Sequence, residues 1–211
     1  MSEHEQPAGP ASALTTIIFD LSEVFIYGLH GMELVLPALV GTEAATIVPA
    51  LAGDGFRDLM EGTISEDAYL AQLLAREGWP IAPEPLKAML RRNFRRAVPG
   101  TWAVLERLNP RLERHLLSDH AREWIAYIEG VHPFLSAFQQ RFYSFALGST
   151  KRETVTFATV LARLGRPPEA CLFIDDNPKN IAVAEAVGLH TVHFTTAAAL
   201  AERLNAQGLL S

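Results

Sequence analysis

The chain has 211 residues, of which 49% are hydrophobic and 20% charged, and its formal net charge is −6. This composition is typical of a globular protein with a sizeable core, and the negative charge gives no electrostatic reason to expect a nucleic-acid or anionic-membrane partner. No apolar stretch approaches the roughly 20 residues that span a bilayer. The single cysteine, Cys171, has no partner for an intrachain disulfide and is expected in the core.

Residues 1–13 are mostly polar and contain proline and glycine. They lack the basic and apolar regions of a secretory signal peptide. We therefore expect this segment to be a flexible tail, and we expect a cytoplasmic protein.

Five short runs have the composition of β-strands: residues 15–21, 114–118, 142–147, 171–176 and 191–195. Helical patterns separate the last three runs. Alternation of strands and helices indicates right-handed βαβ units around a parallel sheet. The expected fold class is therefore α/β, with a Rossmann-like parallel sheet as its core.

Two helices of this core have clear end signals. The first spans residues 153–164 and ends before Gly165, and the residues expected on its buried face are Val155, Ala158, Leu161 and Ala162. The second begins after Asn177 as N-cap, with Pro178 in its first position, and closes at Gly188.

Residues 33–98 contain helical patterns and few strand-like runs. One of these helices begins after Ser65, an N-cap residue followed by two acidic residues. We therefore expect an α-helical cap over residues 26–98, inserted into a core formed by residues 14–25 and 99–211.

Polar groups follow four successive strand candidates. They are Asp20, the pair Ser118 and Asp119, Lys151, and the pair Asp175 and Asp176. Because the carboxyl ends of parallel strands lie along one edge of a sheet, these groups are expected to meet in one site. Carboxylates, a hydroxyl and an ammonium then converge there.

In chain order, the segments "IIFDLSEV", "LLSDH", Lys151 and "LFIDDNPKNI" resemble the four signature motifs of the haloacid dehalogenase-like (HAD) hydrolase superfamily. The resemblance is greatest to phosphatases with a helical cap, including sugar-phosphate phosphatases and the N-terminal domains of epoxide hydrolases. It covers residues 14–25 and about 100–200, whereas the cap is similar only in position, size and helical character.

The resemblance implies a role for each motif residue. Asp20 takes the position of the nucleophile that forms an aspartyl-phosphate, Ser118 and the backbone amide of Asp119 bind the phosphate, and Lys151 neutralises charge. A Mg²⁺ ion is implied at the Asp20 carboxylate, the Ser22 backbone carbonyl and Asp176, because hard cations prefer oxygen ligands. Asp175 is implied as a supporting residue, and Asn180 stands at a further position that is acidic in the family.

Three positions differ from the family pattern. Ser22 stands where the family usually carries a second aspartate, the general acid for the leaving alcohol, and a serine hydroxyl is too weak an acid for that role. Arg152 replaces the usual proline after Lys151. Asp119 replaces an asparagine, and its carboxylate is compatible with bound phosphate only if the side chain turns away.

Two further clusters are less informative. The arginines at positions 91, 92, 95 and 96 are interpreted as a solvated helix face rather than an anion-binding surface. His30, His115, His120 and His132 have no zinc-binding spacing and are interpreted as structural or unassigned.

The leading hypothesis is a Mg²⁺-dependent phosphatase acting on a small phosphorylated metabolite, with the substrate and the oligomeric state left open. A metal-independent 2-haloacid dehalogenase is the alternative enzyme, which the paired aspartates at positions 175 and 176 disfavour. The third hypothesis, supported by Ser22, is a degenerate family member that binds a phosphorylated ligand or a protein without turnover.

Overall fold

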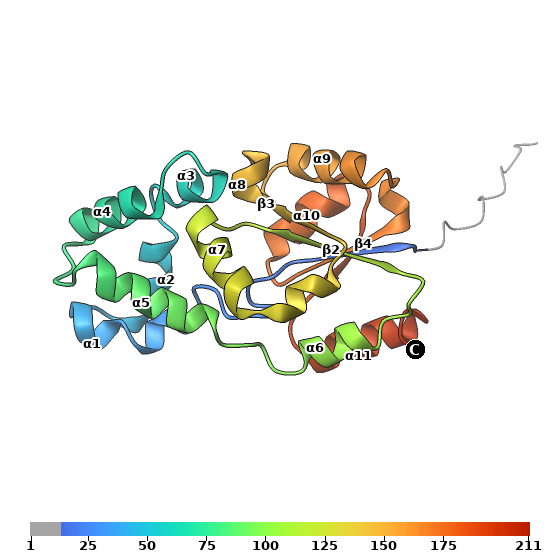
Figure 1. The fold of residues 1–211 in the computed structure, drawn as a ribbon, viewed down its shortest axis with the longest axis horizontal. Coiled ribbons are helices and arrows are strands. Elements are labelled where there is room, and N and C mark those ends of the chain that lie inside the picture. Colours follow the sequence, from blue (N-terminus) through green and yellow to red (C-terminus); the bar gives the residue numbers. More distant parts are fainter. Residues whose placement is uncertain (1–13) are drawn as a thin grey trace, which may run out of the picture.

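A five-stranded parallel sheet forms the centre of the structure (Figure 1), which is a computed structural model that describes residues 14–211. The tail expected over residues 1–13 lies outside the described residues. The strand order is β3-β2-β1-β4-β5. The strands are β1 (Thr16–Phe19), β2 (Glu113–Ser118), β3 (Gln140–Tyr143), β4 (Cys171–Asp175) and β5 (His190–His193). The predicted α/β fold with a parallel sheet is confirmed.

Helices cover both faces of this sheet. Strand side chains alternate between the faces, so Ile17 and Phe19 pack on one side and Ile18 on the other. The first face is covered by α6 (Thr101–Glu106), α7 (Arg122–Val131) and α11 (Ala197–Ala206). The second face is covered by α9 (Thr154–Leu164) and α10 (Pro178–Ala186), and it includes the buried Cys171. Because both faces are buried, the central strands are apolar almost throughout.

Five further helices lie between β1 and α6 in the sequence, beyond the carboxyl ends of the strands (Figure 1). The chain leaves and re-enters the core at one place, where Tyr27 N donates to Arg96 O at 2.9 Å and Val98 N donates to Phe25 O at 2.8 Å. The helices are α1 (Pro37–Val40), α2 (Ala44–Leu51), α3 (Phe56–Glu61), α4 (Glu66–Glu77) and α5 (Pro83–Phe94). The helical character expected of this segment is thus present, and the Ser65 side chain caps α4 as predicted by accepting from Ala68 N.

Short elements complete the described part of the chain. Helix α8 (Ser144–Leu147) follows β3 directly, and 3-10 turns are found at Met32–Leu34, Pro133–Ala137 and Pro168–Ala170. Within residues 14–211, none of the helices has the length and apolar character needed to cross a bilayer.

The third strand is shorter than predicted. The expected strand over residues 142–147 stops at Tyr143, and α8 takes its second half. The Ser144 hydroxyl donates to Met60 O at 2.6 Å and accepts from His120 N at 3.0 Å, and Gly148 ends the turn at φ 70°. These contacts come from residues distant in sequence, so the local β propensity of the run was overridden.

The buried face of α9 also differs from the prediction. The side chains that pack inward are Thr156, Phe157, Val160 and Leu161, whereas Val155 is 54% exposed and Ala158 and Ala162 are exposed. Leu161 is buried as predicted, but apolar residues occur on both sides of this helix, so periodicity alone misplaced the other three. The large Phe157 side chain packs against Phe173 of β4, with the ring centroids 5.0 Å apart, and this contact sets which face of α9 is buried.

Candidate functional site

The site lies where the order of the strands reverses. Strand β1 is central, and its two neighbours, β2 and β4, follow it on opposite sides. Ligands of open α/β sheets bind outside the carboxyl ends of strands at such a switch point. Ser118 is the last residue of β2, Asp175 is the last residue of β4, and Asp20 directly follows β1. The topology therefore brings these residues to one edge.

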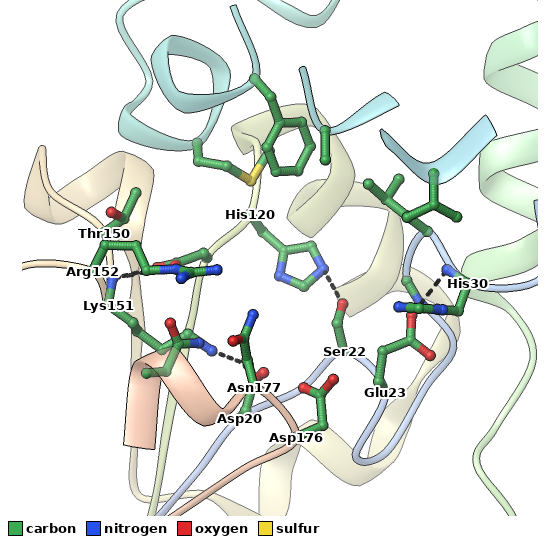
Figure 2. A pocket seen from close by; sticks show the side chains of 18 of the residues that line it. Asp20, Ser22, Glu23, His30, His120, Thr150, Lys151, Arg152, Asp176 and Asn177 are labelled. Carbon is green, nitrogen blue, oxygen red and sulfur yellow. Dashed lines mark hydrogen bonds and ion pairs between the residues drawn. The ribbon is translucent and has the colours of Figure 1, made fainter. Parts of the chain in front are cut away.

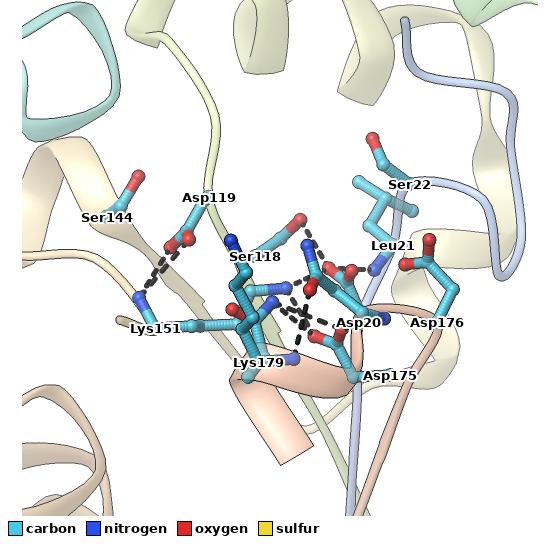
Figure 3. A network of polar contacts seen from close by, with 12 residues as sticks. Asp20, Leu21, Ser22, Ser118, Asp119, Ser144, Lys151, Asp175, Asp176 and Lys179 are labelled. Carbon is cyan, nitrogen blue, oxygen red and sulfur yellow. Dashed lines mark hydrogen bonds and ion pairs between the residues drawn. The ribbon is translucent and has the colours of Figure 1, made fainter. Parts of the chain in front are cut away.

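Lys151 joins two of the carboxylates. Its Nζ lies 2.7 Å from Asp20 Oδ1 and 2.7 Å from Asp175 Oδ2 (Figure 3), and all three residues are buried. Burial alone would lower the pKa of the Lys151 ammonium, but the facing carboxylates of Asp175 and Asp20 outweigh it and hold this pKa above its usual value. Lys151 is therefore a permanent positive charge in the site.

The Asp20 carboxylate presents its two oxygens differently. Oδ1 accepts from Leu21 N at 2.7 Å and from the Ser118 hydroxyl at 3.0 Å, in addition to the contact with Lys151. Among the described residues, no hydrogen-bond donor contacts Oδ2. One oxygen is thus held in place, while the other remains available to a substrate or a cation.

Three aspartates crowd this edge of the sheet. Carboxylate oxygens of Asp20, Asp175 and Asp176 lie within 4.8 Å of one another. Burial raises the pKa of Asp20 despite Lys151, and the charges of Asp175 and Asp176 raise it further. Burial and the Asp175 charge likewise raise the pKa of Asp176. Three carboxylates facing one ammonium leave an excess of negative charge, and this set of hard oxygen donors fits a divalent cation such as Mg²⁺.

Both carboxylate oxygens of Asp175 accept hydrogen bonds from neighbouring residues. Besides Lys151, it accepts from Asn177 N at 2.7 Å and from Asn180 Nδ2 at 3.1 Å. The Asn177 side chain caps α10 as predicted by accepting from Lys179 N. Asp175 therefore orients Lys151 and the start of α10, which is consistent with the supporting role expected of it.

Asp119 turns away from Asp20. Its two carboxylate oxygens accept from the backbone N of Lys151 at 3.1 and 3.2 Å (Figure 3). Burial raises the pKa of this carboxyl group, and the Lys151 charge opposes that rise. The Asp119 side chain thus positions the segment that carries Lys151.

The loop after β1 is tightly folded. Glu23 adopts φ 60°, a left-handed conformation that is uncommon for a residue with a side chain. Its Oε1 accepts from Gly28 N at 2.8 Å and from His30 N at 3.1 Å. A side chain on Gly28 would begin 2.7 Å from Ser22 Oγ, so the loop also requires a glycine there. Ser22 and Glu23 are held facing the cavity.

His120 belongs to the site, although its sequence position alone left it unassigned. Its Nε2 lies 3.0 Å from Ser22 Oγ (Figure 2), and its Nδ1 lies 2.9 Å from Ser118 Oγ. Burial lowers the pKa of this imidazole to about 3, so the ring is neutral at pH 7. Since the Ser118 hydroxyl donates to Asp20, the network assigns the proton to Nδ1 and leaves Nε2 to accept from Ser22.

A cavity of about 480 Å³ opens above these residues. Its size is within the range of small-molecule sites. Charged and polar groups from the strand ends and the following loops line its lower part, including Asp20, Ser22, Asp119, Lys151 and Asp176 (Figure 2). Residues of α2, α3, α5 and α7 line the remainder: Val48, Phe56, Met60, Phe94 and Trp124.

The arginine cluster at the end of α5 and just after it lies outside this cavity. The interpretation as a solvated face is wrong for Arg91, whose guanidinium donates to both oxygens of the buried Glu66. Arg92, Arg95 and Arg96 are exposed. Arg152, the departure from the family pattern, is exposed and lines the cavity.

Comparisons with known proteins identify the fold. No protein-family model and no curated protein matches the sequence. A predicted HAD-like family hydrolase from Porphyromonas gingivalis has a similar structure, with a TM-score of 0.71 and 24% identity, over 90% of this chain and 98% of that one. A HAD family enzyme from Bacteroides thetaiotaomicron, in complex with magnesium and inorganic phosphate, has a TM-score of 0.69 and 19% identity, over 87% and 96% of the two chains.

A dehalogenase has the same architecture. The L-2-haloacid dehalogenase from Xanthobacter autotrophicus, with chloropropionic acid covalently bound, has a TM-score of 0.60 and 17% identity, over 94% of this chain and 85% of that one. At these identities the likeness shows a shared fold. The chain therefore has the fold of HAD-like hydrolases, as its motifs predicted, and this fold occurs with both magnesium-phosphate complexes and dehalogenation chemistry.

Proposed function

We propose that the protein is a Mg²⁺-dependent phosphatase that hydrolyses a small phosphorylated metabolite through an aspartyl-phosphate on Asp20. The observation that carries this proposal is the cluster of Asp20, Asp175 and Asp176 against one ammonium group. A metal-free enzyme has no need of this excess negative charge, whereas phosphoryl transfer requires cations to offset the charge on phosphate oxygens.

Mg²⁺ would be held by Asp20, Asp176 and the backbone carbonyl of Ser22. When bound, the ion supplies positive charge to the phosphate oxygens and to the crowded carboxylates. Asp175 is already engaged by Lys151, Asn177 and Asn180, so it acts by orienting Lys151.

The chain's own groups supply the nucleophile and neutralise charge in both steps of the reaction. Asp20 Oδ2 attacks phosphorus, the bond from phosphorus to the ester oxygen breaks, and the leaving group departs with that electron pair. Water then attacks phosphorus, the bond from phosphorus to Asp20 Oδ2 breaks, and the protons of the water stay with the released inorganic phosphate, which restores the Asp20 carboxylate. Lys151 neutralises charge in both steps, while the Ser118 hydroxyl and Leu21 N hold Asp20 in place.

The site has no strong acid at position 22 to protonate the leaving group. The Ser22 hydroxyl is a weak acid, and it contacts an imidazole that is neutral at pH 7. Neither group supplies the proton that an alkoxide needs to depart. The proposed substrate is therefore an ester with a good leaving group, such as an aryl or acyl phosphate.

A 2-haloacid dehalogenase is the second candidate. It would use Asp20 to attack carbon rather than phosphorus, and it is favoured by the absence of a second carboxylate at Ser22. The fold shared with the dehalogenase from Xanthobacter autotrophicus supports it as an alternative. The aspartate cluster weighs against it.

One screen separates the candidates. The full chain is assayed with acetyl phosphate, para-nitrophenyl phosphate and a sugar phosphate, with and without Mg²⁺, and with chloroacetate in the absence of metal. The proposal predicts Mg²⁺-dependent phosphate release, fastest from the aryl and acyl phosphates. Chloride release without metal would instead identify a dehalogenase, and tight phosphate-ligand binding without any turnover would identify a degenerate binding protein.

A further inference from the structure

The walls of the cavity differ in chemistry from its floor. Beyond the charged strand ends, one wall of the cavity is apolar, with three aromatic side chains among its five: Val48, Met60, Phe56, Phe94 and Trp124. Phe94 and Trp124 are buried with ring centroids 5.1 Å apart, and Phe56 lies 6.2 Å from Trp124. His120, which contacts Ser22, is 6.4 Å from both Phe94 and Trp124, so the aromatic wall begins beside the reactive groups.

The polar atoms of this wall already have partners. Trp124 Nε1 donates to Glu66 Oε1 at 2.7 Å, and the carbonyl of Phe94 accepts from His132 Nε2 at 2.7 Å. The carbonyl of Met60 accepts from the Ser144 hydroxyl at 2.6 Å. Both nitrogens of His120 are engaged by serine hydroxyls. A hydroxyl group placed against this wall would lose its water and find no free partner.

Three charged residues that line the cavity lie at its rim, whereas Glu23 is half-buried and its Oε1 accepts from Gly28 N and His30 N. His30, Arg57 and Arg152 are exposed. Arg57 is occupied as well, since it pairs with Glu61 at 2.6 Å and with Glu153 at 2.9 Å, the latter on the core side of the cavity. The rim therefore provides solvent-exposed charge and leaves the interior of the wall apolar.

We propose that the cavity selects phosphate monoesters whose organic group is an apolar ring, and that it rejects polyhydroxylated groups such as sugars. This inference rests on the proposed function for the placement of the phosphoryl group at Asp20 and Lys151. Aromatic walls favour ring-shaped ligands through edge-to-face and offset contacts. The organic group lies between Phe56, Phe94 and Trp124.

Binding of unreactive analogues tests this selectivity without requiring turnover. Calorimetry on the full chain with Mg²⁺ compares benzylphosphonate with 2,3-dihydroxypropylphosphonate, which share the phosphonate group. The expected Kd of benzylphosphonate is lower by about 10²-fold, as is typical for discrimination by an apolar pocket. Equal affinities, or tighter binding of the dihydroxy compound, would overturn the proposal.

Two variants locate the preference. Val48→Thr replaces one methyl group of the wall with a hydroxyl at nearly constant volume, and Phe56→Ala removes one aromatic ring. Either change should lower the ratio of the dihydroxypropylphosphonate Kd to the benzylphosphonate Kd. Val155→Thr makes the same change at an exposed position of α9 outside the cavity and should leave the ratio as it is. A ratio unaffected by either wall variant would place the preference elsewhere and contradict the proposal.

Acetyl phosphate separates this inference from the proposed function. Turnover of acetyl phosphate together with equal phosphonate affinities would retain the phosphatase and refute the apolar wall as its selector. A strong preference for benzylphosphonate without any turnover would support the cavity's selectivity and refute the catalytic proposal.

Discussion

His120 Nε2 lies 3.0 Å from the hydroxyl oxygen of Ser22, the residue at the position where the phosphatases that its motifs resemble usually carry a general acid. The other ring nitrogen lies 2.9 Å from Ser118, whose hydroxyl donates to Asp20. The position that would normally provide a proton is therefore bound to a neutral imidazole, and the same imidazole orients the hydroxyl beside the nucleophile. We therefore expect the rate of hydrolysis to depend mainly on how easily the leaving group departs without a proton.

Replacing Ser22 should change which esters are hydrolysed. In Ser22→Asp, a carboxylic acid is available to protonate the leaving alcohol, so kcat for an alkyl phosphate is expected to rise by up to about 10²–10⁴-fold, the usual contribution of general acid–base catalysis. Hydrolysis of para-nitrophenyl phosphate should change far less. Steady-state kinetics on both esters measures the ratio, with Ser22→Ala as the control that removes the hydroxyl without adding an acid. An alkyl phosphate already hydrolysed as fast as the aryl ester by the parent would show that another group supplies the proton.

Removing Asp176 should weaken Mg²⁺ binding. Asp176→Asn keeps the size of the side chain but removes one charged oxygen ligand, and hard divalent cations depend on such ligands. Calorimetric titration with MgCl₂ is expected to show at least about a tenfold loss of affinity. Asp54→Asn, an exposed site outside the cavity, is the matched control. Unchanged Mg²⁺ affinity in Asp176→Asn would remove Asp176 from the metal site.

Neutralising Asp20 should stabilise the metal-free protein. Burial and two neighbouring carboxylates raise the pKa of Asp20, so its charged form destabilises the fold at pH 7 despite Lys151. Asp20→Asn retains an oxygen that can accept from Ser118 and Leu21 N. We expect the free energy of unfolding in urea to rise by about 1 kcal/mol, as occurs when a strained functional group is removed. A clear loss of stability would mean that the ion pair with Lys151 outweighs the repulsion.

Acid should destabilise the protein through His120. The pKa of this imidazole is about 3 in the folded state, against about 6.5 when unfolded. Between these values the unfolded chain binds a proton that the folded chain does not, so this contribution to stability is complete above pH 6.5 and declines as the pH falls toward 3. Between pH 7 and pH 5 the loss is roughly 2 kcal/mol.

His120→Gln isolates that contribution. The buried carboxylates are present in both proteins, so the difference between their urea-unfolding curves at pH 7 and pH 5, measured with a metal chelator, reports on His120. The parent should lose more stability than the variant on acidification. Identical pH dependence would show that His120 titrates normally.

Much of the core of the site could be predicted because its signals are local. Two segments each combine a buried strand with acidic residues at its end: the apolar run that ends at Asp20, and β4 (Cys171–Asp175) with Asp176 after it. Parallel pairing then brings these ends together. Ser118 and Lys151 were predicted at this edge for the same reason, because each follows a strand candidate of the parallel sheet.

The remainder depended on contacts between distant residues. His120 contacts a serine 98 positions away, and only the adjacency of β1 and β2 creates that pair. The cavity wall combines residues of four helices, whose mutual orientation has no local sequence signal. On α9, apolar residues on both sides of the helix concealed that Phe157 rather than Val155 faces the core.

The central claim is that Asp20 becomes phosphorylated, and mass spectrometry of the quenched enzyme tests it most directly. The full chain is mixed with para-nitrophenyl phosphate and Mg²⁺, stopped in acid and digested. The account predicts one added phosphoryl group on Asp20 in the parent, and no such group in Asp20→Asn or when Mg²⁺ is removed by a chelator. Phosphate release from the parent with an unmodified Asp20, or a phosphoryl group on a different residue, would contradict it.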